Sequence, residues 1–307
     1  MIRVGTRGSK LAMAQCGQVA EELARVSGEE VELVAIKTVG DSSLAPVQRL
    51  GVGVFVNQLR EELDRGAIDV AVHSYKDLPT DQPERFAIAV PPRADPRDAL
   101  VSSDGRTLSE LPAGARIGTG SPRRMSQLLA MGRGFEPVPI RGNIDTRLAR
   151  VGDDLDAVVL AAAGMKRAGR ESEVSDFLDP LVMLPAPAQG ALAVECRKAD
   201  TTTVQISSML NDRYSQAAAE AERGLLQRLE AGCSAPVAAL ADVSEAAEPG
   251  RIDLYLRGAV FAIDGSEFER LSTTAELGEG DDAAAVGWAL AEELLDAGAE
   301  RLLKSNT

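Results

Sequence analysis

Two stretches of the chain, RVGTRGSK at residues 3–10 and RIGTGSPRR at residues 116–124, share one pattern. Each reads arginine, a β-branched residue, glycine and threonine, followed by a turn with a serine before a helical segment. A buried strand that passes through a tight turn into a helix is typical of a βα unit. Because the pattern occurs twice, the sequence predicts two domains of similar topology, each beginning a helix at the same strand end.

Around the first stretch, strands and helices alternate. We expect strands at 2–6, 31–37 and 69–73, and helices from Lys10 and over 55–65. Turn residues at 41–53 indicate a loop. This βαβαβ order is typical of a parallel sheet with helices on its faces. A proline-rich stretch at 90–96 then predicts the crossing into the second domain.

The second half predicts further strands and a third domain. We expect strands at 135–140, 156–162, 190–195, 237–241, 252–262 and 268–274, and helices at 216–231 and 283–297. The strand at 190–195 is expected to return to the first sheet. The helix at 216–231 is expected to end at Gly232, which would adopt a left-handed backbone conformation. The predicted fold class is α/β, with two similar domains whose mixed, mainly parallel sheets flank a cleft, and a small α+β third domain. The predicted domains are 1–92 with 190–210, 97–186, and 214–307.

The composition is that of a globular protein, with 45% apolar and 26% charged residues among 307. The longest nearly apolar run, 157–165, is too short for a membrane span. The N-terminus has no apolar segment, so we expect no signal peptide. Three cysteines without paired spacing argue against a disulfide framework and favour a reducing cytoplasm. A single histidine, His73, excludes a histidine-rich zinc site, and we expect no metal.

The net charge is −14, and the acid is concentrated in the last third of the chain. Residues 189–307 hold 21 acidic side chains against 10 basic ones, and the whole chain has only 6 lysines. Nucleic-acid binding is excluded, because there is no basic stripe with interleaved aromatic residues. Few lysines with surplus carboxylates are typical of a halophilic-type acidic protein kept soluble in concentrated salt. The alternative is a bacterial protein that is merely acidic.

Three predicted helix starts have arginines beside them. The expected N-caps are Ser9, Ser121 with Pro122 at the first helical position, and Asn143. The neighbouring arginines are Arg7, Arg123, Arg124, Arg141 and Arg147. Helix starts and arginine forks both bind anions, so the set predicts a ligand with several negative groups. Carboxylates are favoured because no phosphate-binding motif is present. The alternative is that these arginines pair with the chain's own 47 acidic side chains.

Two further positions suggest chemistry. Lys76 and Asp77 follow a predicted strand, and in extended backbone their side chains would point to opposite sides. Asp77 could stay ionised and face a cationic intermediate, or the two could form an ordinary surface pair. Cys233 lies in a predicted turn, where its thiol could be reactive or carry a covalent group. The alternative, a small buried side chain, fits Cys16 and Cys196 better.

Together these segments resemble the porphobilinogen deaminase (hydroxymethylbilane synthase) family, almost throughout the chain and in order. The matching stretches are TRGSKLAMAQ (6–15), VHSYKDLP (72–79), DPRDALVS (95–102), IGTGSPRR (117–124), RGNIDTRL (141–148), LAAAGMKRAG (160–169), LPAPAQGALAVECR (184–197) and ERGLLQRLEAGCSAP (222–236). The resemblance implies a transferase that joins four porphobilinogen molecules head to tail, losing ammonia each time, and releases a linear tetrapyrrole. It also implies a covalent dipyrromethane cofactor and a three-domain fold like that of periplasmic binding proteins.

The resemblance assigns roles residue by residue. The catalytic aspartate falls on Asp77, with Lys76 beside it, and the thioether to dipyrromethane falls on Cys233. The residues implied to bind the cofactor are Arg7, Ser9, Ser74, Lys76, Asp77, Thr119, Ser121, Arg123, Arg124, Arg141 and Gly142. The residues implied to bind the substrate are Arg7, Gln15, Arg141, Arg147 and Arg167. The implied small-molecule partner is porphobilinogen. The resemblance also implies a monomeric enzyme of the cytoplasm that passes its product to uroporphyrinogen-III synthase. It implies no binding to membranes or nucleic acids.

Two positions depart from the family's pattern. The loop before the second helix usually carries lysines, but here it reads QRLGVGVF at 48–55, where Arg49 could substitute. Tyr75 replaces a residue that is usually apolar. Two other classes stay open: a non-enzymatic two-domain protein that binds organic anions, which leaves Cys233 unexplained, and an anion-sensing regulator. The regulator would need a helix-turn-helix segment and a basic face, and the sequence indicates neither.

Overall fold

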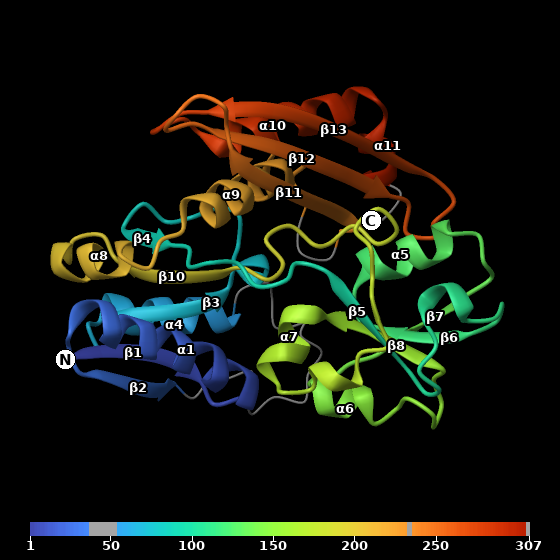
Figure 1. The fold of residues 1–307 in the computed structure, drawn as a ribbon, viewed down its shortest axis with the longest axis horizontal. Helices are drawn as coiled ribbons and strands as arrows, with labels where there is room; N and C mark the ends of the chain where they lie inside the picture. The colour runs from blue at the N-terminus through green and yellow to red at the C-terminus, as the bar shows by residue number, and fades with distance from the viewer. Residues whose placement is uncertain (37–53, 232–234, 305–307) are drawn as a thin grey trace. The chain divides into compact units, whose positions relative to one another are not determined.

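The computed structural model describes residues 1–36, 54–231 and 235–304 (Figure 1). The loop expected at 41–53 with Arg49, and the turn with Gly232 and Cys233, lie outside the described residues. The chain divides into two compact units. Unit 1 comprises Met1–Arg93 with Ala191–Gln216, and unit 2 comprises Ala94–Gly190 with Ala217–Thr307.

Unit 1 contains a five-stranded mixed sheet. Its strands, in spatial order, are β2 (Val31–Ile36), β1 (Ile2–Arg7), β3 (Val70–Ser74), β10 (Leu192–Arg197) and β4 (Phe86–Ala89). Strand β1 is parallel to β2 and β3, whereas β10 is antiparallel to both of its neighbours. The predicted return of a strand from the second half of the chain to the first sheet is therefore confirmed.

Helices cover both faces of this sheet (Figure 1). They are α1 (Lys10–Ser27) and α8 (Thr201–Ser208) on one face and α4 (Val54–Asp64) on the other. Leu23 of α1 packs with Val70 and Val194 in one apolar cluster, and Leu59 of α4 packs with Ala71 in another. Alternate residues of a strand point to opposite faces, so the β3 run of apolar residues is buried on both sides.

Unit 2 repeats this sheet. The strand order is β7 (Glu136–Pro139), β6 (Arg116–Thr119), β8 (Ala157–Ala161), β5 (Asp98–Ser102) and β9 (Asp176–Phe177). Here β6 is parallel to β7 and β8, and β5 in the fourth position is antiparallel to both of its neighbours. The two sheets thus have the same order of parallel and antiparallel strands, and β6 occupies the position that β1 has in unit 1. The internal repeat read from the sequence is confirmed.

Three helices accompany the second sheet: α5 (Pro122–Ala130), α6 (Ile144–Leu148) and α7 (Ala162–Arg167). Leu128 of α5 belongs to one apolar cluster of the sheet, while Leu148 of α6 and Met165 of α7 belong to another. Short 3-10 helices occur at η1 (Tyr75–Asp77), η2 (Leu108–Glu110) and η3 (Glu171–Glu173). Among the described residues, no helix is both long and apolar enough to cross a membrane.

A three-stranded antiparallel sheet completes unit 2. It consists of β11 (Val237–Glu245), β12 (Ile252–Phe261) and β13 (Phe268–Leu277), with the helices α9 (Arg213–Arg228), α10 (Ala283–Asp296) and α11 (Ala299–Lys304). A Cβ atom on Gly287 of α10 would lie 1.9 Å from the carbonyl oxygen of Ala221 of α9, so only glycine permits this helix contact. The predicted fold class, two similar mixed sheets and a small α+β part, is confirmed.

One helix end differs from the prediction. The helix expected to run to Ala231 ends at Arg228, and Glu230 adopts a left-handed backbone with φ of 49°. The Glu230 N–H donates to the Gln227 carbonyl at 3.0 Å, which closes the last turn of the helix. A glutamate rarely takes this conformation, because its Cβ crowds the backbone, so the sequence favoured the later glycine.

Candidate functional site

Predicted site residues of unit 1 gather at the carboxyl ends of two neighbouring parallel strands. Arg7 ends β1 and Ser9 caps α1, accepting a hydrogen bond from the Ala12 N–H at 3.3 Å. Ser74 ends β3, which pairs with β1 in parallel. Because both strands end at the same edge of the sheet, Arg7, Ser9 and Ser74 lie at one edge of unit 1.

A hydrogen bond links the first helix to this edge. The Gln15 Nε2 atom donates to Ser74 Oγ at 3.2 Å, and the Gln15 side chain is buried. Side chains of a strand alternate between the two faces of the sheet, so Ser74 lies on the same face as Val70 and Val72. These two valines pack in the apolar cluster that contains residues of α1. Gln15 therefore lies beside Ser74 in the unit 1 group.

The turn with Lys76 and Asp77 differs from the prediction. Both residues lie in the 3-10 helix η1, and not in extended backbone, so their side chains diverge by about 120° and not 180°. The Tyr75 N–H donates to the Ala191 carbonyl at 3.1 Å, and the Leu78 N–H donates to the Tyr75 carbonyl at 3.2 Å. Tyr75 is buried, as an apolar residue at this position would be, while Asp77 is exposed.

A second group lies where β6, β7 and β8 of unit 2 end. Thr119 ends β6 and is fully buried, and its Oγ1 accepts a hydrogen bond from the Ser121 N–H at 3.3 Å. Ser121 occupies the N-cap position of α5 with Pro122 in the first turn, as predicted, but its side chain makes no capping hydrogen bond. The helix start is set by the backbone and by Pro122, which has no N–H to satisfy.

The start of α6 follows the prediction closely. The Asn143 side chain accepts a hydrogen bond from the Thr146 N–H at 2.8 Å, and Arg147 Nε donates to the Gly142 carbonyl at 2.8 Å. Gly142 has a φ of 102°, and a Cβ there would lie 2.8 Å from Thr146. The Arg147 guanidinium also lies 3.8 Å from the position of a Cβ on Gly120, so it reaches the start of α5.

Arg123 and Arg124 bind a carboxylate of the chain itself. Asp98 of β5 has no exposed surface, and its oxygens lie 2.8 Å from Arg123 Nη2 and 2.7 Å from Arg124 Nη2. Arg123 also donates to the Leu184 carbonyl at 2.6 Å, and Arg124 to the Val159 carbonyl at 3.0 Å. For these two arginines, the alternative left open by the sequence, pairing with the protein's own acid, holds.

The charge around Asp98 is unequal, with one carboxylate against two guanidinium groups. Burial by itself would raise the pKa of Asp98, but the charges of Arg123 and Arg124 hold that pKa well below its usual range. Burial lowers the pKa of Arg123. Gln189 adds a hydrogen bond to Asp98 Oδ1 at 2.8 Å. The cluster therefore keeps one surplus positive charge close to the ends of β6 and β8.

Two other arginines, Arg147 and Arg167, have no acidic partner among the residues that the structure describes. Burial lowers the pKa of Arg147 and of Arg167, and the charge of Arg124 lowers that of Arg147 further. Arg167 Nη2 donates to the Gly190 carbonyl at 2.9 Å. Across residues 1–36, 54–231 and 235–304, neither arginine forms an ion pair. A carboxylate ligand beside them would regain the electrostatic energy that burial costs their guanidinium groups.

The two cysteines that the structure describes, Cys16 and Cys196, are not reactive nucleophiles. Cys16 and Cys196 are buried, and burial raises the pKa of Cys16 to about 11 and that of Cys196 above its usual value. The thiolate is the nucleophilic form, so neither residue offers one at neutral pH. The prediction that these two are structural is therefore confirmed, while Cys233 lies outside the described residues.

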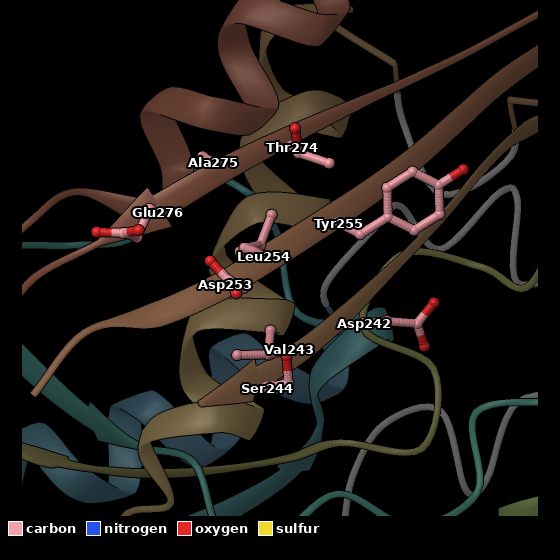
Figure 2. A pocket seen from close by; sticks show the side chains of 9 residues that line it. All are labelled: Asp242, Val243, Ser244, Asp253, Leu254, Tyr255, Thr274, Ala275 and Glu276. Carbon is pink, nitrogen blue, oxygen red and sulfur yellow. The ribbon is translucent and has the colours of Figure 1, made fainter. Parts of the chain in front are cut away.

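A pocket that shares no residue with either group lies on the three-stranded sheet (Figure 2). It measures about 530 Å³ and is lined by Asp242, Val243, Ser244, Asp253, Leu254, Tyr255, Thr274, Ala275 and Glu276. Arg257 pairs with Asp242 at 2.7 Å and Arg251 pairs with Glu276. With no cation in its lining, the pocket is a poor site for a polycarboxylate. Within the described ranges, no group of His, Cys, Asp and Glu side chains could hold a metal ion.

Two residues that organise the site escaped the sequence analysis. Asp98 is the first residue of β5, directly before the apolar residues 99–101, and Gln189 follows a proline-rich stretch before β10. A carboxylate in a buried strand requires a partner, because an unpaired buried charge is costly. That rule was the available signal for Asp98, but it does not say which arginine the carboxylate meets.

Comparison with known families agrees with this arrangement. The family model described as porphobilinogen deaminase, dipyromethane cofactor binding domain, matches residues 2–205, and the one described as porphobilinogen deaminase, C-terminal domain, matches residues 216–296. The porphobilinogen deaminase of Nocardia farcinica is 56% identical, over 98% of this chain and 88% of that protein. That of Mycobacteroides abscessus is 54% identical, over 99% of both chains.

Solved structures give weaker likenesses. A periplasmic substrate-binding protein of an ABC transporter from Coxiella burnetii is 17% identical, with a TM-score of 0.41 over 73% of this chain and 97% of that chain. The L-cystine solute receptor of Neisseria gonorrhoeae is 17% identical, with a TM-score of 0.40 over 76% and 94%. The sequence matches are decisive, because they extend over almost the whole chain at more than half identity. The chain belongs to the porphobilinogen deaminase family.

Proposed function

We propose that this chain is a hydroxymethylbilane synthase. It condenses four porphobilinogen molecules head to tail, primed on a covalent dipyrromethane, and then releases the linear tetrapyrrole by hydrolysis. Each condensation breaks a carbon–nitrogen bond, releases ammonia, forms a carbon–carbon bond and returns a proton. The observation that carries the proposal is the match of both family domains and of full-length relatives to nearly the whole chain.

The unit 2 arginines fit a ligand of this kind. Each pyrrole unit carries an acetate and a propionate, so a short chain of pyrroles is a polycarboxylate. The Asp98 cluster holds a surplus positive charge, and Arg147 and Arg167 have no acidic partner in the described part of the chain. Fixed guanidinium forks recognise carboxylates with two parallel hydrogen bonds. When bound, dipyrromethane supplies the anchored pyrrole to which new units are added.

We assign roles on this basis. Asp77 and Lys76 are the catalytic pair, and Cys233 holds the cofactor covalently. The cofactor's carboxylates and pyrroles are held by residues of both groups, namely Arg7, Ser9, Ser74, Lys76, Asp77, Thr119, Ser121, Arg123, Arg124, Arg141 and Gly142. The substrate is bound by Arg7, Gln15, Arg141, Arg147 and Arg167. Because Arg123 and Arg124 are bonded to Asp98, their part is to supply positive charge from a fixed position.

Asp77 is suited to act on a developing cation. Its carboxylate is exposed at the end of β3, on a turn whose backbone is hydrogen-bonded to Ala191. A fixed negative charge stabilises the positive charge that arises as ammonia leaves porphobilinogen, and it can accept or return a proton. Lys76, the residue before Asp77 in the turn, supplies a cation that binds carboxylates of the cofactor.

The remaining assignments are also proposals. The chain is organised as three domains, 1–92 with 190–210, 97–186, and 214–307, which the separate three-stranded sheet supports. It acts as a monomer in the cytoplasm, and its product passes to uroporphyrinogen-III synthase. The reduced, buried state of Cys16 and Cys196 is consistent with a reducing compartment.

Intact mass spectrometry combined with an Ehrlich-type colour test examines the function directly. Purified protein should carry the added mass of two linked pyrroles, give the pyrrole colour, and release ammonia when porphobilinogen is added. A protein that binds porphobilinogen reversibly, with no added mass and no ammonia, would instead be an organic-anion binder. That outcome would refute the proposed activity while leaving the family assignment in place.

A further inference from the structure

A buried ionic cluster lies behind the Asp77 turn, on the face of the unit 1 sheet that α4 covers. Glu195 of β10 is fully buried and accepts hydrogen bonds from Arg60 Nη2 of α4 at 2.7 Å and from Arg60 Nε at 3.0 Å. Its second oxygen lies 3.1 Å from His73 Nε2 of β3. We call Arg60, His73 and Glu195 the Glu195 cluster. None of these residues was assigned a role above.

The Glu195 cluster is internal and balanced. One carboxylate faces one guanidinium, and the hydrogen bonds from His73 and Arg60 keep the pKa of Glu195 low although burial would raise it. All three side chains are buried, so the cluster offers no surface to a ligand. The cluster instead fixes the guanidinium of Arg60 in one orientation, because a bidentate pair in a dry interior has a defined geometry.

Arg60 also reaches out of the cluster. Its Nη2 donates to Gln82 Oε1 at 2.5 Å, and Gln82 Nε2 donates to the carbonyl oxygen of Pro79. Pro79 follows Asp77 by two residues, directly after Leu78. On the other side of the turn, the Tyr75 N–H is bonded to the Ala191 carbonyl. The turn with Asp77 is therefore held before it by the backbone of the sheet and after it by Gln82.

We propose that Gln82, oriented by Arg60, is a positioning residue for catalysis that fixes the Asp77 turn through the Pro79 carbonyl. The role rests on the proposed function of Asp77. The exposed Asp77 carboxylate has to keep one position while charge develops on the substrate, and a misplacement of about 1 Å in such a group can cost on the order of 100-fold in rate. A side-chain amide suits this task, since it accepts from Arg60 and donates to Pro79 at once.

Two variants of Gln82 and one control test the role, and none of them changes a residue of the buried ion pair. Gln82→Met keeps the length of the side chain and removes both hydrogen bonds. Gln82→Glu keeps an acceptor for Arg60 but has no donor for Pro79. Asp81→Asn changes the exposed neighbouring residue and serves as the matched control. The measurements are amide exchange at Leu78, single-turnover rate and KM on cofactor-loaded protein, thermal midpoint, and the NMR signal of His73, the one histidine of the chain.

Both Gln82 variants should speed exchange at the Leu78 amide. They should also lower the single-turnover rate about five- to tenfold, because a carboxylate displaced by less than about 1 Å loses part of the 100-fold effect of a full misplacement. KM, the thermal midpoint and the His73 signal should stay close to those of the parent, as should every property of Asp81→Asn. If Gln82 were merely structural, its substitution would shift the thermal midpoint and would not lower the single-turnover rate while leaving KM unchanged.

Unchanged Leu78 exchange in Gln82→Met overturns the proposal whatever the activity. A parent rate in Gln82→Glu also overturns it, because the Pro79 contact is then without effect. If Leu78 exchange rises while the rates of both variants equal the parent rate, the turn is held but its position does not matter for catalysis, and the role is refuted. A parent protein with no activity at all refutes the proposed function, and the Leu78 measurement still reports separately whether Gln82 holds the turn.

Discussion

The Nη2 atom of Arg124 lies 2.7 Å from Oδ1 of Asp98, a carboxylate with no exposed surface. The same carboxylate binds Arg123, so one acidic side chain holds two guanidinium groups that stand at the start of α5. Asp98 thereby holds two buried guanidinium groups in place, and the stability of unit 2 should depend on it.

The variant Asp98→Asn should be strongly destabilised. It would leave two buried guanidinium groups without a counter-charge, and breaking such a buried pair costs about 3–5 kcal/mol. The free energy of unfolding, measured with urea at neutral pH, checks this. Asp104→Asn is the control, since the Asp104 side chain is 43% exposed and its pairing with Arg106 contributes little. Equal stability of Asp98→Asn and the parent would contradict the structure.

The contribution of Asp98 should also depend on pH. Its pKa in the folded state is held below the ordinary value of 3.8. The stabilisation is therefore complete above that ordinary value and is lost as the pH falls toward the folded pKa. The difference in unfolding free energy between the parent and Asp98→Asn should stay constant from neutral pH down to about pH 4 and shrink below it. A difference that shrinks only at alkaline pH would have the wrong sign.

The variant Asp77→Asn should lose chemistry and keep its fold. The change is nearly isosteric but removes the charge that stabilises the developing cation, and losing one preorganised electrostatic partner costs on the order of 100- to 1000-fold in rate. Single-turnover kinetics on cofactor-loaded protein measure the effect. The thermal midpoint should barely move, because the carboxylate is exposed. Near-normal turnover would show that another group performs the acid–base work.

The variants Arg147→Ala and Arg124→Ala should separate binding from folding. Arg147 has no acidic partner among the described residues, so its removal should raise KM or impair cofactor assembly with little loss of stability. Arg124 is hydrogen-bonded to Asp98 and to the Val159 carbonyl, so its removal should mainly lower the thermal midpoint, by more than the removal of Arg147 does. Substrate titration and thermal unfolding of both proteins check this. Equal destabilisation by the two changes would refute the distinction.

Cys233 should carry the dipyrromethane. Cys16 and Cys196 are buried thiols whose pKa values are raised by burial, so neither competes as a nucleophile at neutral pH. Peptide mapping of active enzyme should find two linked pyrrole units on Cys233, and Cys233→Ser should fail to assemble holoenzyme. A pyrrole adduct on Cys16 or Cys196, or active enzyme with unmodified Cys233, would disprove the assignment.

Stability should rise with salt. The chain has a net charge of −14, with 21 acidic against 10 basic residues in 189–307, and like charges repel across several ångströms in dilute buffer. The thermal midpoint should increase steadily with KCl concentration. Salt also screens the attraction between arginines and carboxylates, so KM for porphobilinogen should not improve in parallel. A midpoint that is already maximal in dilute buffer would contradict the halophilic reading of the composition.

Local features of the site could be predicted from the sequence, because they depend on neighbours along the chain. Ser9 and Asn143 cap their helices by reaching an N–H three residues ahead, and Pro122 suits a first helical turn by its fixed φ. The βα repeat was visible because both copies use the same short pattern. The strand-end placement of Ser74 followed from the apolar run before it.

Contacts between distant residues were decided only by the tertiary structure. Arg60 and Glu195 are 135 residues apart, and no local pattern says that α4 will lie over β10. The pairing of Asp98 with Arg123 and Arg124 was likewise hidden, because a sequence shows that a buried charge needs a partner and not which partner it meets. Glu230 is left-handed although the sequence favoured a glycine for such a position, and Asp77 lies in a 3-10 turn, because backbone hydrogen bonds close both turns.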